Sequence, residues 1–245
     1  MSLLTGIYNK TQLHIDKYCK NIHQNKVMCC VCNNILIAKK GNINMHHYAH
    51  EKNTDCIIKR DNDCKTAWHI LWQNIAKPEF LEKYMNNDGE IHIADVINEK
   101  NMVIEIQHSN LSQEEIEKRE KFYDNMIWIL DGTDIVKIEK ADAKTNDKID
   151  KEYVCVKYGT MFTTTNNYHV VKTTKKFWSK ITKKAYIDTG CGMLEIIKHI
   201  GNNFCICKNI KYIDFLDKYY KKILISSIED TNNLDVSIID KEKIN

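Results

Sequence analysis

The fold of this chain is decided by the stretch HIADVINEKNMVIEIQHS, residues 92–109. Apolar and polar residues alternate over residues 90–97, and a second, mostly apolar run begins after NEKN, so the pattern predicts two strands joined by a turn. Asp95 lies near the end of the first strand, and Glu105 and Gln107 share one face of the second because strand side chains alternate. We therefore expect a β-hairpin in which Asp95 approaches the face that carries Glu105.

Two carboxylates in one pocket suit Mg²⁺ or Mn²⁺, which prefer hard oxygen ligands. Such a metal activates a water molecule and neutralises charge on a scissile phosphate. Glu105 and Gln107 interrupt the apolar run MVIEIQ, where burial of polar groups without a ligand is costly. We interpret Asp95 and Glu105 as metal ligands and Gln107 as the residue that orients water or phosphate. The alternative is the exposed polar face of an edge strand.

Further elements flank this hairpin. Large apolar residues near helical spacing predict a helix within residues 66–85 that breaks or restarts at Pro78. Ser112 precedes Glu115 by three positions, a capping box that begins a charged amphipathic helix, and NMIWILD at residues 125–131 is a buried strand by composition. Runs such as KAYIDTG, GMLEIIKHI and NFCICKNI make the remainder β-rich. The order predicts an α/β core with a mixed sheet flanked by helices.

Residues 27–50 carry two pairs of metal-ligand residues. Cys29 and Cys32 form a CxxC motif, and the sequence HHYAH at residues 46–50 follows after a loop. Two chelating pairs satisfy the tetrahedral preference of zinc, and the spacing alone leaves His46 and His47 open as the partner of His50. Packed thiols beside exposed histidines are the alternative. Cys56 and Cys64 flank the next helix, but no paired partners support a second site.

Several motifs, in this order and spacing, resemble the competence protein CoiA-like nuclease family of the PD-(D/E)XK restriction-endonuclease-like superfamily. They are the CxxC with HYAH, AWHILW (67–72), HIADV (92–96), VIEIQHS (103–109), SQEEIEKREKFY (112–123) and MIWILDG (126–132). The resemblance is continuous over residues 27–132 and weaker at KAYIDTGCGMLEI. It favours His47 over His46 as a zinc ligand.

The resemblance implies a metal-dependent nuclease core with Asp95 and Glu105 as the metal ligands. Gln107 occupies the slot where the superfamily usually has a catalytic Lys, although relatives in this family tend to carry Gln there as well. His69 and His92 match family positions and would orient water or contact phosphate; core histidines are the alternative.

Two departures lie around the first helix, where the family usually shows Glu-Ser before the His and a Lys four residues after it. This chain has Lys65-Thr66 and Gln73 in those slots. The helix Glu would be a third acidic ligand of the metal. Its replacement by Lys65 leaves Asp63 as a substitute.

The formal net charge of +3 conceals an uneven distribution. The net charge is +5 over residues 1–50, −7 over residues 51–132 and +5 over residues 133–245. Residues 153–186 contain seven Lys, among them Lys172, Lys175 and Lys176, no acid, and interleaved aromatic residues, a pattern that suits phosphate neutralisation and base stacking. Arg119 is one of two Arg against 34 Lys, which favours a phosphate fork; a helix pair with Glu115 is the alternative.

The sequence lacks an apolar run long enough to span a membrane and a recognisable signal peptide, so we expect an intracellular protein with no membrane partner. The family resemblance implies a bacterial or viral origin. The ten Cys then act as reduced thiols or metal ligands, and thiol redox chemistry at the CxxC is disfavoured because no thioredoxin-like βαβ context accompanies it.

We expect three parts: a zinc-finger-like element (1–60), a nuclease core (61–132) and a basic β-rich region (133–245). The expected function is that of a Mg²⁺-dependent deoxyribonuclease in DNA processing, repair or recombination, with Zn²⁺ as a structural metal. We expect DNA rather than RNA as the partner, and the sequence is compatible with a homo-oligomer. The alternative is a catalytically inactive nucleic-acid-binding protein with the same fold.

Overall fold

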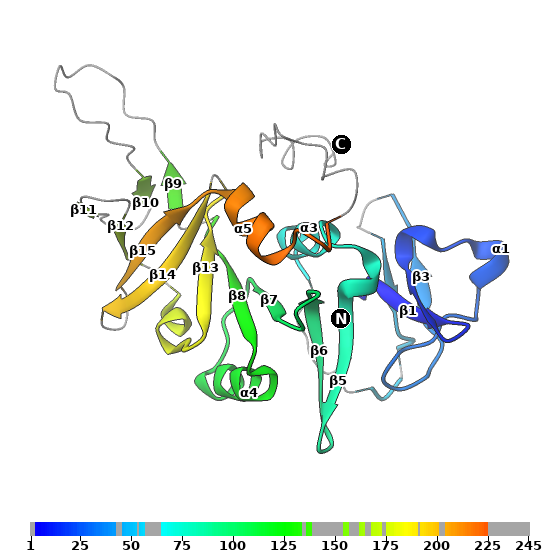
Figure 1. The fold of residues 1–245 in the computed structure, drawn as a ribbon. Coiled ribbons are helices and arrows are strands. Elements are labelled where there is room, and N and C mark those ends of the chain that lie inside the picture. The colour runs from blue at the N-terminus through cyan, green and yellow to red at the C-terminus, as the bar shows by residue number, and fades with distance from the viewer. Residues whose placement is uncertain are drawn as a thin grey trace. The chain divides into compact units, whose positions relative to one another are not determined.

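The computed structural model describes residues 3–42, 46–52, 54–56, 65–133, 136–138, 154–156, 162–164, 168–172, 175–190, 192–200 and 204–224. The chain forms two compact units (Figure 1). Unit 1 comprises Met1–Glu105 with Lys222–Thr231, and unit 2 comprises Ile106–Lys221 with Asn232–Asn245. The division into residues 1–60, 61–132 and 133–245 stays a sequence-based prediction beside these two units.

The described part of unit 1 consists of short hairpins, the helices α1 and α3, two 3-10 turns and the predicted strand pair. Its elements are β1 (Thr5–Tyr8), β2 (Thr11–His14), η1 (Ile15–Lys17), α1 (Lys20–His23), β3 (Ile37–Lys39), β4 (His47–Ala49), α3 (Ala67–Asn74), η2 (Pro78–Phe80), β5 (Leu81–Asn87), β6 (Glu90–Ile97) and β7 (Val103–Gln107), whose last two residues are counted in unit 2. The pairs β1–β2, β3–β4, β5–β6 and β6–β7 are all antiparallel.

The predicted hairpin is confirmed. Strands β6 and β7 pair in the register Val96↔Ile104 and Ile97↔Val103. The side chain of Asn98 accepts hydrogen bonds from two backbone N–H groups of the turn, which holds the connection closed.

The helix predicted within residues 66–85 is correct only in its first half. Helix α3 begins after Thr66, whose hydroxyl accepts a hydrogen bond from the backbone N–H of His69 at 3.2 Å, and it ends at Asn74. Pro78 starts a short 3-10 turn, and residues 81–87 then form strand β5 instead of a second helix. The apolar residues of this stretch fit either period, and pairing with β6 decides in favour of the strand (Figure 1).

Unit 2 contains the mixed sheet that the sequence predicts. Its elements are α4 (Gln113–Tyr123), β8 (Met126–Asp131), β9 (Val136–Ile138), β10 (Val154–Val156), β11 (Phe162–Thr164), β12 (Tyr168–Lys172), η3 (Lys176–Lys180), β13 (Lys184–Asp188), β14 (Met193–Ile200), β15 (Phe204–Ile210) and α5 (Tyr212–Tyr219). Strand β13 is parallel to β8 and antiparallel to β14, and β15, β12 and β11 continue the sheet in antiparallel order. The α/β fold with a mixed sheet and a β-rich C-terminal region is therefore confirmed.

Helix α4 is fixed at its start by the predicted cap and near its end by a buried acid. The hydroxyl of Ser112 accepts a hydrogen bond from the N–H of Glu115 at 3.1 Å. Glu120 is buried and accepts hydrogen bonds from the Trp128 indole at 3.0 Å, from Thr182, and from the backbone N–H of Lys183 at 3.1 Å. One carboxylate thus ties α4 to β8 and to the segment before β13.

Glu120→Gln is expected to lower the free energy of unfolding by about 3 kcal/mol, because an amide –NH₂ group would replace one acceptor oxygen and face buried donors. Urea unfolding of the variant measures this loss. Glu117→Gln, on the same helix where Glu117 is exposed and bonded to Gln113, is the matched control and is expected to change stability little. Equal stability of the two variants would show that Glu120 is not an anchor.

Among the described residues, no helix is both long enough and apolar enough to cross a membrane.

Candidate functional site

Asp95 on β6 and Glu105 on β7 lie opposite each other in unit 1. The ladder ends at Val96↔Ile104, so Asp95 and Glu105 are the next residues along the two strands, and the backbone N–H of Asp95 donates to Oε1 of Glu105 at 3.4 Å. The side chain of Asp95 is 13% exposed, and Glu105 is 2% exposed. The strand pairing therefore brings together the two carboxylates predicted to bind metal, one of them accessible and the other fully enclosed.

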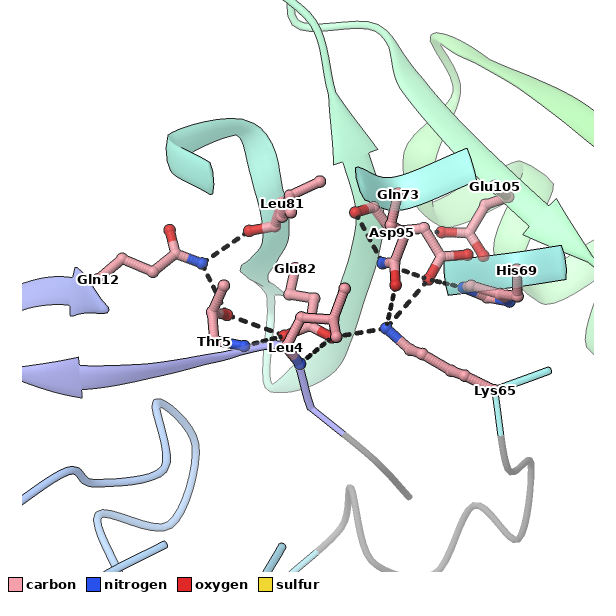
Figure 2. A network of polar contacts seen from close by, with 10 residues as sticks. All are labelled: Leu4, Thr5, Gln12, Lys65, His69, Gln73, Leu81, Glu82, Asp95 and Glu105. Carbon is pink, nitrogen blue, oxygen red and sulfur yellow. Dashed lines mark hydrogen bonds and ion pairs between the residues drawn. The ribbon is translucent and has the colours of Figure 1, made fainter. Parts of the chain in front are cut away.

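Helix α3 directs two side chains onto Asp95 (Figure 2). Nε2 of His69 lies 2.9 Å from Oδ1 of Asp95, and Nε2 of Gln73 lies 3.3 Å from the same oxygen and 3.2 Å from the Asp95 carbonyl oxygen. His69 and Gln73 are four residues apart and so share one face of the helix. His69, predicted from the sequence as a site residue, is placed at the carboxylate pair.

Sequence reasoning missed a buried ion pair beside these residues. Nζ of Lys65 lies 2.5 Å from Oε1 of Glu82, 2.8 Å from Oε1 of Gln73 and 3.8 Å from Oδ1 of Asp95 (Figure 2). The side chains of Lys65 and Glu82 are 4% and 2% exposed. From the sequence, Lys65 was recognised only as a departure from the family pattern. Glu82 was not recognised because it lies in the stretch predicted to be helical.

Glu82 is held in an unusual backbone conformation. Its φ of +47° lies in the left-handed region, which a non-glycine residue adopts at a cost. Its carboxylate accepts hydrogen bonds from the N–H of Leu4 at 3.0 Å, the N–H of Thr5 at 2.9 Å and the Thr5 hydroxyl at 2.8 Å. Gln12 in turn donates to Thr5 Oγ1 and to the Leu81 carbonyl oxygen. The N-terminal hairpin of unit 1 therefore fixes Glu82, and Glu82 fixes Lys65.

The charges of this group suit a divalent cation. The carboxylates of Glu82 and Asp95 lie 2.5 and 3.8 Å from the ammonium of Lys65, and Glu105 accepts from the backbone N–H of Asp95. The formal charges of these four side chains sum to −2. Glu82 is already bonded to two N–H groups, a hydroxyl and the ammonium. Asp95 and Glu105 are the two carboxylates of this group that the sequence predicts as ligands of Mg²⁺ or Mn²⁺.

The other residues predicted for catalysis lie elsewhere in the strands. His92 is three residues before Asp95 on β6, hence on the opposite strand face, and its Nε2 lies 2.8 Å from Glu90 Oε1. Gln107 is buried two residues beyond Glu105 on β7, and its amide donates to the carbonyl oxygen and hydroxyl of Ser109 at 2.8 and 3.0 Å. The structure does not bring His92 to the carboxylate pair. Asp63 lies outside the described residues.

The residues predicted to contact nucleic acid are in unit 2. Arg119 donates from Nε to Glu115 Oε1 at 2.8 Å, one helical turn away, which is the helix pair named above as the alternative. Lys175 donates to the carbonyl oxygens of His108 and Asp131, whereas Lys176 is exposed at the start of η3. Lys172 lies on β12, but its side chain is outside the described residues.

A second cluster of metal-ligand residues lies in the N-terminal part of unit 1. The ligand atoms of Cys29, Cys32, His50 and Cys56 all lie within 4.8 Å of one another. Three of these four were predicted; the fourth is Cys56, and His47 on β4 is not in the group. Sequence spacing identified ligands by their occurrence in close pairs. Cys56 is a single cysteine six residues after His50, so the spacing did not predict it as a ligand.

The cluster has the dimensions of a tetrahedral zinc site. The sulfurs of Cys29 and Cys56 are 4.0 Å apart, and Cys32 Sγ lies 3.4 Å from His50 Nε2. Zinc bonds of about 2.3 Å to sulfur and 2.0 Å to nitrogen place two sulfurs about 3.8 Å apart and a sulfur about 3.5 Å from a nitrogen. The backbone N–H of Val31 also donates to Cys29 Sγ at 3.4 Å, a contact that stabilises a thiolate. The donor set is consistent with a structural Zn²⁺.

Unit 2 contains a His–Asp pair that sequence reasoning missed. Asp131, buried at the end of β8, is hydrogen-bonded to Nδ1 of His108 and accepts from the N–H and the hydroxyl of Thr133 at 3.0 and 2.6 Å. Burial by itself would raise the pKa of Asp131, but the hydrogen bonds from Thr133 and His108 outweigh it and lower the pKa below 3.8.

Because the folded-state pKa of Asp131 is lowered, its carboxylate stabilises the fold above the unfolded-state value and loses this effect as the pH falls through the folded-state pKa. We expect Asp131→Asn to lower the thermal midpoint at pH 7, and the difference from wild type to shrink as the pH falls below about 4. Thermal unfolding from pH 7 to pH 3 measures the difference. A constant difference over this range would mean that the ionised carboxylate does not stabilise the fold.

Two family comparisons agree with this layout. Residues 11–59 match the family description "Competence protein CoiA, N-terminal domain", and residues 71–186 match "Competence protein CoiA, nuclease-like domain". A search of curated proteins and a search of solved structures each gave no significant match. The first matched range contains all four residues of the zinc-type cluster, and the second contains Asp95 and Glu105. With both domains present in this order, the chain belongs to the competence protein CoiA family, and its nuclease-like domain implies the PD-(D/E)XK superfamily.

Proposed function

We propose that this protein is a Mg²⁺- or Mn²⁺-dependent nuclease that hydrolyses phosphodiester bonds of DNA. The observation that carries the proposal is the contact between Asp95 and Glu105 beside the β6–β7 ladder, within a group whose formal charge is −2. The match of residues 71–186 to a nuclease-like domain suggests the reaction class.

The side chains around Asp95 have distinct parts in this proposal. Asp95 and Glu105 would hold the divalent cation, which when bound lowers the pKa of water and neutralises phosphate charge. His69 and Gln73 hold the Asp95 carboxylate in one orientation through their contacts at 2.9 and 3.3 Å.

The zinc-type cluster supports this site structurally. Cys29, Cys32, His50 and Cys56 connect loops in a part of the chain with short strands, where a bound Zn²⁺ substitutes for a large apolar core. The same part of unit 1 carries Leu4 and Thr5, whose N–H groups bind Glu82. We assign the zinc element a role in folding rather than in hydrolysis.

A second candidate function is nucleic-acid binding without hydrolysis. It is favoured by Gln107, whose amide is bonded to Ser109, and by Lys65, whose ammonium lies beside Asp95. A binding protein of this kind would show salt-dependent affinity and no metal-dependent turnover.

The two functions are separated by incubating the purified protein with single-stranded, duplex and branched DNA and with RNA, each with Mg²⁺, Mn²⁺ or EDTA. A nuclease yields shortened products with either metal and none with EDTA, and the panel identifies the preferred substrate. Retarded but intact nucleic acid under all three conditions would support the binding protein instead.

A further inference from the structure

The hydrolysis proposed above assigns no part to the ammonium of Lys65. Lysine is rarely buried unless its charge is paired, and Lys65 is buried against three different oxygens. Two of these belong to carboxylates, Glu82 on β5 and Asp95 on β6, and the third to the amide of Gln73 on α3 (Figure 2).

We propose that Lys65 is a positioning residue of the metal site: it holds Gln73 and Asp95 in the orientation that catalysis needs, and it sets the charge of the site to that of one divalent cation. This inference rests on the proposed function and deepens it. It assigns the positive charge that Gln107 does not supply to a residue just before helix α3.

The first support is a series of contacts that connects the N-terminal hairpin to Asp95. Leu4 and Thr5 fix the Glu82 carboxylate, and Glu82 holds the Lys65 ammonium at 2.5 Å. Lysine can only donate hydrogen bonds, so the oxygen of the Gln73 amide faces Lys65 and the nitrogen is left to face Asp95. Lys65 thus decides which way the Gln73 amide points, and Gln73 contacts both the carboxylate and the carbonyl oxygen of Asp95.

The second support is the charge of the site. With Lys65 in place, the three carboxylates retain two negative charges, which one Mg²⁺ or Mn²⁺ neutralises. Without the ammonium the same group carries three. A full charge 3.8 Å from Asp95 Oδ1 outweighs one neutral hydrogen bond, so removal of Lys65 is expected to tighten cation binding although it frees Gln73. The tighter complex would be less productive, because Asp95 is no longer held in one orientation.

The test compares Mn²⁺ affinity, by titration followed with electron paramagnetic resonance, and the rate of DNA cleavage in the full-length, zinc-loaded protein. Lys65→Met is expected to bind Mn²⁺ about tenfold more tightly and to cleave DNA at least about tenfold more slowly. A merely structural role for Lys65 would weaken both. Lys65→Arg, which keeps the charge, is expected to retain the wild-type Mn²⁺ affinity.

Two further variants keep the test decisive if Lys65→Met leaves Glu82 unpaired and does not fold. Lys65→Met combined with Glu82→Gln removes both charges, and its Mn²⁺ affinity is expected to return to the wild-type value. Lys83→Met is the matched control: Lys83 is on β5 beside Glu82, but it bonds to Gln12 and not to Asp95, so Mn²⁺ affinity should not change.

Weaker or unchanged Mn²⁺ binding by folded Lys65→Met overturns the inference, as does a double variant that binds Mn²⁺ much more tightly than wild type. The proposed function fails separately. A wild-type protein that binds Mn²⁺ but cleaves no nucleic acid contradicts the nuclease and leaves the Mn²⁺ comparison valid, whereas a wild-type protein that binds no Mn²⁺ contradicts both.

Discussion

Asp95→Asn is expected to lower the rate of Mg²⁺-dependent DNA cleavage by about a thousandfold, while DNA affinity changes by less than about twofold. The variant keeps the shape of the side chain and an oxygen that can accept from His69 and Gln73. It removes the negative charge that, in our proposal, the cation neutralises at the accessible member of the carboxylate pair. A thousandfold loss corresponds to about 4 kcal/mol of transition-state stabilisation, the size expected when a metal ligand is lost.

Glu99→Gln is the matched control, because Glu99 is exposed in the turn of the same hairpin and the change is chemically equivalent. We expect it to cleave at the wild-type rate. Cleavage by Asp95→Asn at the wild-type rate would remove Asp95 from the metal site, and loss of both cleavage and DNA binding would indicate a folding defect.

Cys56→Ser is expected to weaken zinc binding by at least about a hundredfold and to unfold the N-terminal part of unit 1. The reason is that Cys56 Sγ completes the group with Cys29, Cys32 and His50, and three ligands hold zinc much less tightly than four. Zinc content by atomic spectroscopy, together with the thermal midpoint, measures the effect. About one zinc per chain is expected in the wild type.

Two further variants test whether Cys56 or His47, the residue predicted from the sequence, is the zinc ligand. Cys19→Ser alters an exposed cysteine outside the cluster and should leave the zinc content unchanged. His47→Ala should also retain zinc, because His47 is not in the cluster. Full zinc content in Cys56→Ser with loss of zinc in His47→Ala would show that the sequence-based ligand set is the correct one.

The parts of the structure that depend on local periodicity could be predicted from the sequence. Alternation over residues 90–97 and the apolar run after NEKN gave the β6–β7 hairpin, and the interval between Ser112 and Glu115 gave the start of α4. In each case the physical cause lies within a few residues of the pattern, in side-chain alternation or in a cap. The pairing of Asp95 with Glu105 belongs to this class because a short turn fixes the register.

The parts of the structure that depend on residues distant in the sequence could not be predicted. Residues 81–87 have apolar spacing compatible with a helix, and only pairing with β6 makes them a strand. The left-handed backbone of Glu82 is maintained by Leu4 and Thr5, which are more than seventy positions away in the sequence. The contacts of Lys65 could not be predicted for the same reason. Its ammonium pairs with Glu82, and no local sequence pattern connects these two residues.

The most direct test of the central claim is the cleavage of DNA by wild-type protein that has been freed of divalent cations other than its zinc and then titrated with Mg²⁺. Our account predicts no cleavage without Mg²⁺, cleavage that rises to saturation as Mg²⁺ is added, and loss of that cleavage in Asp95→Asn at every Mg²⁺ concentration. Cleavage that persists without Mg²⁺, or that Mg²⁺ restores equally in wild type and Asp95→Asn, would contradict the assignment of Asp95 and Glu105 as the metal site of a nuclease.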